Sequence, residues 1–197
     1  MPTQNPELSH LSSHAPLLAN LKSLSRKELK RLFLDLPTPG IEEINGEYQG
    51  ILLNQGNTAI TAVTRFFVNK EGVWLGKAFQ PMSETSGRGY NLFQTRSGIR
   101  RSLRMQLVLS DDNDQKRLTI EYSSLNEGLV GSISDELRRV APGLFLGIGI
   151  VPLGGRLFPT LSRKVTFALV GPTGDFRVEA AESDVFVQHD KFDSIAA

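Results

Sequence analysis

Residues 99–125, IRRSLRMQLVLSDDNDQKRLTIEYSSL, decide the fold because they hold two alternating segments joined by an acidic turn. In the first segment the odd-numbered positions are mainly apolar and the even-numbered positions mainly polar. In the second, Leu118, Ile120 and Tyr122 share one face. A period of two with one polar face is typical of a β-strand that has one side buried and one side in water. These residues therefore predict an antiparallel hairpin.

Working outward from this hairpin, further short β-rich segments follow one another, separated by turn residues. They are 46–53, 58–68, 73–79, 88–96, 144–151 and 163–170, with a weaker one near 176–180. Eight or nine strands joined by short turns favour a mainly β protein, an antiparallel up-and-down barrel or a sandwich. We expect the barrel, of about 8–9 strands.

One or two helices are expected to precede the strands. Leucines recur at helical spacing from Leu17 to Leu24, and again from Leu29 to Leu36. Between the two sets, Ser25 and Glu28 form a capping-box pattern, so a second helix should run over residues 26–35. The expected organisation is a tail at 1–15, one domain at 16–180 and a tail at 181–197.

The segment 134–155, SDELRRVAPGLFLGIGIVPLGG, is the most apolar part of the chain. Its apolar portion, about 15 residues long, is shorter than the roughly 20 residues of a membrane helix. It also lacks the Gly-Lys-Ser/Thr of a phosphate loop. We expect a short helical turn over 135–140, then a strand over 144–151. Gly147 and Gly149 would leave space there for a ligand or for another side chain.

The amino-acid composition argues against several classes of function. A net charge of +1 provides no global field for nucleic acid or an anionic membrane surface. The chain has no cysteine, which excludes disulfides and thiolate chemistry and fits a reducing cytoplasm. The N-terminal residues lack an apolar run behind a basic start, so no signal peptide is expected. We expect a cytoplasmic protein without a transmembrane segment.

Conventional catalytic and metal-binding patterns are weak. The three histidines, His10, His14 and His189, all lie in the expected tails. The acidic turn at 111–114 lacks the glycine and closing glutamate of a calcium loop. The sequence therefore indicates no catalytic residue, no metal and no cofactor.

Arg101 stands out within the only dense basic cluster, which also holds Arg96, Arg100 and Arg104. Alternation places Arg101 on the inner face of its strand and Arg100 and Arg104 on the outer face. A buried guanidinium needs a hydrogen-bonding or charged partner. We expect Arg101 to be a candidate partner for a ligand carboxylate.

Several short motifs carry a family resemblance. GEYQG at 46–50 begins the first strand, followed by WLGKAF at 74–79, NLF at 91–93, DELR at 135–138 and LFLG at 144–147. Their order resembles the bacterial GXWXG proteins of unknown function, with Tyr48 where the motif has tryptophan, and more loosely the lipocalin and fatty-acid-binding barrels. The resemblance implies a small β-barrel that captures an apolar ligand.

The leading functional hypothesis is a non-enzymatic protein that binds a small hydrophobic ligand, such as a fatty acid or similar lipid-like carboxylate. The candidate ligand-binding residues are Tyr48, Trp74, Tyr90, Phe93, Arg101, Met105, Tyr122 and Phe145. One alternative is a structural protein with a filled core, which docks a protein partner or a second copy. Another is an isomerase or cyclase that uses Tyr122 or Glu121 as acid or base and Arg101 as oxyanion partner.

Overall fold

The computed structural model describes residues 13–56, 72–112, 115–126, 130–154, 158–182 and 185–188, with backbone alone for 112, 151–154, 158–163 and 185–188. The strands are β1 (Gly46–Leu52), β2 (Val73–Pro81), β3 (Ser86–Thr95), β4 (Gly98–Asp112), β5 (Gln115–Glu121), β6 (Ser134–Ala141), β7 (Leu144–Gly154), β8 (Phe158–Gly174) and β9 (Val185–Gln188). The strand expected at 58–68 lies outside the described residues.

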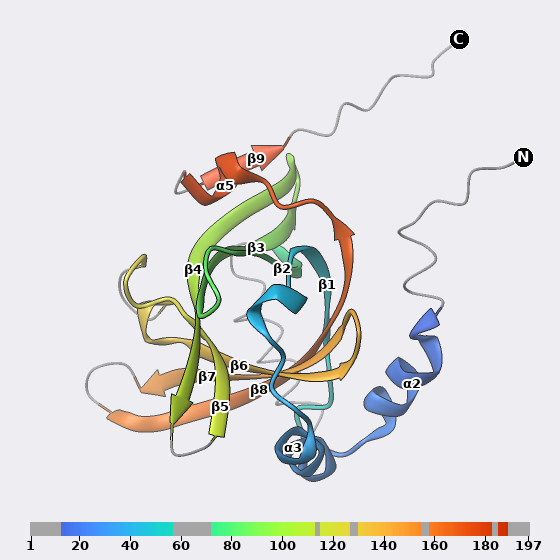
Figure 1. The fold of residues 1–197 in the computed structure, drawn as a ribbon. Coiled ribbons are helices and arrows are strands. Elements are labelled where there is room, and N and C mark those ends of the chain that lie inside the picture. The colour runs from blue at the N-terminus through green and yellow to red at the C-terminus, as the bar shows by residue number, and fades with distance from the viewer. Residues whose placement is uncertain are drawn as a thin grey trace, which may run out of the picture.

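Strands β1 to β8 form a closed up-and-down barrel (Figure 1). Each strand pairs antiparallel with the next one along the chain, and β8 returns to pair with β1. Closure leaves none of the eight strands as a free sheet edge. The expected barrel fold is confirmed.

The barrel interior holds an apolar core. Its buried side chains come from strands all around the barrel and include Tyr48, Phe79, Met105, Leu118, Leu137, Phe145 and Phe167. The 3₁₀ turn η1 (Ile41–Glu43) precedes β1. The fully buried Ile41, and Ile44 directly after the turn, belong to this core. Glu43 is paired with Arg139 of β6 at 2.6 Å. One end of the barrel is thus closed by η1.

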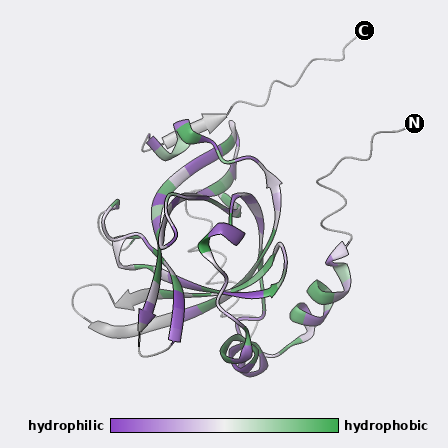
Figure 2. Cartoon of the chain, in the orientation of Figure 1, coloured by the Kyte–Doolittle hydropathy of each residue, from purple (hydrophilic) through white to green (hydrophobic). Residues whose placement is uncertain are grey.

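The helices α2 (Ala15–Ser23) and α3 (Arg26–Asp35) lie outside the barrel (Figure 1). The Ser25 hydroxyl accepts the Glu28 N–H, and the Glu28 carboxylate accepts the Ser25 N–H, so the predicted capping box is present. Hydrophilic and hydrophobic residues are interleaved along both helices (Figure 2). Their apolar faces pack on outward-facing side chains of β7 and β8. The buried set includes Leu18, Leu21, Leu29, Phe33, Leu144, Leu146, Ala168 and Val170.

Two sequence-based predictions of secondary structure were wrong. Residues 134–141 form β6 and not a helical turn. Asp135 and Leu137 both point inward there, and an inward carboxylate conceals the period of two. Residues 178–182 form the short helix α5 (Val178–Glu182) where a weak strand was expected. β9, within the expected C-terminal tail, pairs with β4. No helix in the described residues is long and apolar enough to cross a membrane.

Candidate functional site

A glycine bulge in β2 brings two polar side chains into the barrel. Trp74 and Lys77 are three residues apart and would lie on opposite faces of a regular strand. The register between β2 and β3 shifts between Trp74 and Gly76, and Gly76 has a φ of 151°. A Cβ at Gly76 would lie 1.9 Å from the Tyr48 carbonyl oxygen. The bulge therefore requires glycine, and it turns Trp74 and Lys77 to the same inner face.

Lys77 is the centre of a buried polar cluster. Its ammonium donates to Asp135 Oδ2 at 2.9 Å, to Asn91 Oδ1 at 3.0 Å and to the Tyr122 hydroxyl at 2.5 Å. The Tyr122 hydroxyl in turn donates to Asp135 Oδ2 at 3.2 Å. The side chains of Lys77 and Asp135 are each only 6% exposed. Three acceptors satisfy the three ammonium protons, so the buried cation is fully hydrogen-bonded.

Asn91 connects this cluster to the barrel wall. Its Oδ1 also accepts the Trp74 indole N–H at 3.1 Å. Its amide nitrogen donates to the Leu103 carbonyl at 3.3 Å and to the Tyr122 hydroxyl at 3.2 Å. Each polar atom of the Asn91 side chain therefore has two partners, and the orientation of Trp74 is set by this amide.

Burial and charge together determine the protonation states of the cluster. Burial by itself would lower the pKa of Lys77, but the Asp135 carboxylate and the hydrogen bonds raise the pKa above its ordinary value. Burial, followed by the Asp135 charge, raises the pKa of Tyr122 to about 12. Near neutral pH the cluster holds a charged lysine and a neutral phenol.

Inward-facing glycines make room for the aromatic side chains beside the ammonium. A Cβ at Gly50 would clash with the Trp74 ring, and one at Gly147 would clash with the Phe167 ring. Those two rings meet edge to face at 5.8 Å, and the Lys77 ammonium lies 5.8 and 5.5 Å from their centroids. A Cβ at Gly149 would lie 2.5 Å from Asp135 Oδ1. The space beside Gly147 and Gly149 is therefore filled by side chains.

Two polar atoms beside the cluster retain hydrogen-bonding capacity. Asp135 Oδ2 accepts two hydrogen bonds, whereas Oδ1 accepts none from the described residues. Ser102 is 2% exposed, and its hydroxyl has no hydrogen-bond partner in the described part of the chain. Ser102 lies opposite Asn91 in the β3–β4 register. Buried polar atoms normally have a partner, so the Ser102 hydroxyl is a candidate for ligand contact.

A second bulge, in β4, reverses the expected direction of Arg101. Gly89 pairs with Met105 while Asn91 pairs with Ser102, so β4 carries one extra residue between these pairs. Leu103 in this bulge has a φ of 56°, unusual for a side chain of its size. One extra residue reverses the alternation on the far side of the bulge, here in the residues that precede Leu103. Arg100 and Ser102 therefore face inward and Arg101 outward, which corrects the sequence-based assignment.

Arg101 forms a second buried ion pair on the outer face of the barrel. Its Nε lies 2.7 Å from Glu47 Oε1 and its Nη2 lies 3.1 Å from Glu47 Oε2. The Tyr90 hydroxyl donates to Glu47 Oε1 at 2.8 Å and accepts the Arg177 N–H at 2.8 Å. The Tyr90 ring packs on Phe176 at 5.0 Å. Arg101 and Tyr90 thus belong to the contact between the barrel and its C-terminal segment.

The structure separates the eight predicted ligand residues into two groups. Six face the interior, namely Tyr48, Trp74, Phe93, Met105, Tyr122 and Phe145. By strand register, Trp74, Phe93 and Tyr122 lie toward the end opposite η1. Tyr48, Met105, Tyr122 and Phe145 belong to the packed apolar core, and Trp74 packs against it. Tyr90 and Arg101 lie outside the barrel. Glu121 pairs with the exposed Gln106 across β4 and β5, so its side chain also faces outward. The ligand-binding role of each residue stays a prediction.

Sequence reasoning missed Lys77, Asn91, Asp135 and Ser102. For Lys77 a signal existed, since Gly76 within a strand marks a bulge that turns the following side chain. For Ser102 no local signal existed, because the bulge is at a leucine. No group of histidine, aspartate or glutamate residues with metal-binding geometry occurs among the described residues.

Comparisons with known proteins give one structure that is similar to this chain in fold. No protein-family model and no curated protein sequence matches the chain. A crystal structure of a protein from Thermomonospora curvata is similar to it, with a TM-score of 0.50 and 16% identical residues. The match covers 86% of this chain and 99% of that one. At this identity the likeness shows the fold alone, and the resemblance to the GXWXG proteins stays a prediction.

Proposed function

We propose that the protein binds a small, mainly apolar molecule in the barrel interior, at the end opposite η1. Trp74, Phe93 and Ser102 face the interior at this end, and the Lys77–Asp135 cluster lies next to them. The proposal rests chiefly on this cluster. Replacing a buried ion pair by apolar residues of similar volume is often neutral or stabilising, so stability is a weak explanation for this cluster.

The unpaired atoms indicate the polar end of the ligand. Asp135 Oδ1 is an acceptor on an anionic group, and Ser102 can donate or accept. The Lys77 ammonium has no proton left for a ligand, since its three acceptors are within the protein. Arg101, the expected carboxylate partner, is held by Glu47. A hydroxyl-bearing ligand therefore fits these groups better than a carboxylate does.

Trp74, the only tryptophan in the chain, provides a direct readout. The purified protein is titrated with 1-dodecanol and with lauric acid, which share a chain length and differ in the polar end, while Trp74 emission is followed. We expect a saturable change for both, with the alcohol binding about tenfold more tightly, as one good hydrogen bond to a charged acceptor allows. Native mass spectrometry of protein purified from its host tests for a co-purifying lipid.

The matched variants are Ser102→Ala and Ser86→Ala. Ser102 is inside the barrel, whereas Ser86 is exposed at the other end. Weaker dodecanol binding in the Ser102 variant alone would support the site. If neither ligand changes Trp74 emission and no lipid co-purifies, the binding proposal is wrong. If lauric acid binds more tightly than dodecanol, the interior site is supported, but the preference for a hydroxyl-bearing ligand is wrong.

A further inference from the structure

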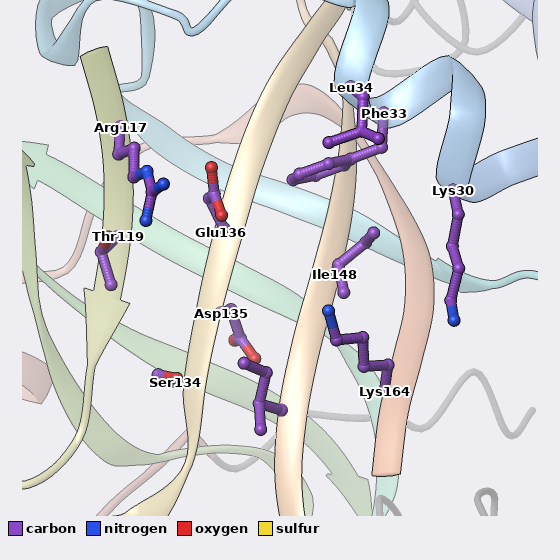
Figure 3. Close-up of a pocket in the computed structure, with 11 residues that line it drawn as sticks. Lys30, Phe33, Leu34, Arg117, Thr119, Ser134, Asp135, Glu136, Ile148 and Lys164 are labelled. Carbon is purple, nitrogen blue, oxygen red and sulfur yellow. The ribbon is translucent and has the colours of Figure 1, made fainter. Parts of the chain in front are cut away.

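A groove on the outer face of the barrel lies between α3 and strands β5 to β8 (Figure 3). It has a volume of about 370 Å³, and its lining residues are Lys30, Phe33, Leu34, Arg117, Thr119, Ser134, Asp135, Glu136, Ile148, Ile150 and Lys164. The groove shares Asp135 with the proposed interior site, but Phe33 and Ile148 of its lining belong to the cluster outside the barrel.

The groove exposes apolar surface between its two sides. Phe33 and Ile148 are nearly buried, while Ile150 is 39% exposed and Leu34 is 78% exposed. Leu34 extends from α3 beside the Phe33 ring, above Ile148 in the view of Figure 3. Single exposed apolar residues are common, but these two border one concavity. The groove can therefore seat apolar side chains from another molecule.

The charges around this apolar surface are unbalanced. Lys30, Arg117 and Lys164 come from three different elements and form no ion pair with a described residue. The two acidic residues of the lining are neutralised, Glu136 by Arg138 at 2.6 Å and Asp135 by Lys77. A chain with a net charge of only +1 thus presents at one groove three cations that no described acidic residue neutralises.

We propose that this groove docks an acidic amphipathic segment of a partner protein. Apolar side chains of the segment lie between α3 and β7, and its carboxylates meet Lys30, Arg117 and Lys164. Helix-in-groove recognition combines apolar anchors and flanking charges in this way. Cations on both sides of the groove favour an elongated anion over a single carboxylate, and an apolar surface set into a concavity favours inserted side chains over a flat membrane.

The probe is a fluorescein-labelled 14-residue peptide with leucines at helical i, i+3 and i+4 spacing and glutamates elsewhere, followed by anisotropy. We expect saturable binding that weakens as salt rises, because the rim charges are exposed. Lys30→Glu/Arg117→Glu/Lys164→Glu should weaken binding at least about tenfold, and Leu34→Ser about threefold to tenfold. In the wild-type protein, amide shifts on peptide addition should centre on Leu34, Ile148 and Ile150.

The control variant Lys22→Glu/Arg96→Glu/Arg177→Glu changes the net charge equally at exposed sites outside the groove, and should bind the peptide as the wild type does. Equal weakening by both triple variants, or amide shifts elsewhere, would overturn the proposal. So would absence of peptide binding combined with groove-dependent binding to phosphatidylglycerol vesicles, which would make the groove a membrane contact. The amide shifts decide the case even if a variant folds poorly.

Discussion

The barrel contains two buried ion pairs built from the same ingredients and placed on opposite faces of its wall. Inside, Lys77 pairs with Asp135 beside Tyr122; outside, Arg101 pairs with Glu47 beside Tyr90. The side chains are 6% and 6% exposed in the inner pair, and 3% and 12% exposed in the outer pair. Burial alone therefore does not distinguish them.

The difference lies in geometry and in unused hydrogen-bonding capacity. Arg101 binds both oxygens of Glu47 through its planar fork, and Tyr90 adds a contact to the chain before α5. This arrangement fastens two parts of the chain together. The Lys77 ammonium is a compact charge that binds three separate side chains, those of Asp135, Asn91 and Tyr122. Asp135 Oδ1 is left without a partner among the described residues. The outer pair thus joins two parts of the chain, whereas the inner pair leaves one carboxylate oxygen available, as the proposed ligand site requires.

The largest effect is expected from Asp135→Ala, which leaves the Lys77 charge buried without its partner. The loss should be about 3–5 kcal/mol in the free energy of unfolding, measured by urea denaturation. Lys77→Met/Asp135→Leu should regain most of that loss, because apolar residues then fill the space. A double variant as unstable as the sum of its single variants would contradict a coupled pair.

Removing the outer pair should cost less and leave the interior unaffected. Arg101→Met deprives Glu47 of two charge-assisted hydrogen bonds, for a loss of about 2–3 kcal/mol in unfolding free energy. Glu47 is partly open to water, which limits the penalty. The Trp74 response to dodecanol should match that of the wild type. A changed response would show that the two pairs are not separate.

The inner tyrosine should make stability fall at high pH. Burial raises the pKa of Tyr122 from 10.0 to about 12, so its contribution is fully present below about pH 10 and is lost as the pH rises toward 12. The raised pKa of Lys77 acts in the same direction. Urea midpoints measured across this range should fall less steeply for Tyr122→Phe. Parallel curves for variant and wild type would contradict the raised pKa.

The smallest effect is expected from Tyr90→Phe. Its hydroxyl donates to Glu47 and accepts from the Arg177 backbone, while its ring stays packed on Phe176. A loss of about 1–2 kcal/mol in unfolding free energy should follow. Hydrogen exchange should increase for the Arg177 amide. Unchanged exchange there would mean that the outer pair does not hold the C-terminal segment.

Much of the fold was predictable because it rests on local patterns. The period of two at 99–125 predicted β4 and β5, and Ser25 with Glu28 marked the start of α3. β6 was missed because Asp135 is inward in a segment where only apolar residues were expected to be buried. Its burial depends on Lys77, 58 positions earlier in the numbering, so no local pattern reports it.

The sequence by itself determined the class of fold, since strand periodicity, turn residues and a capping box act within a few residues of one another. Only the tertiary structure decided which polar side chains lie inside. The bulges at Gly76 and Leu103 each shift the strand by one residue, turning Lys77 and Ser102 inward and Arg101 outward. Whether a strand bulges depends on its neighbours across the sheet, because an extra residue is retained only where the paired strand and the packing beneath it accommodate it.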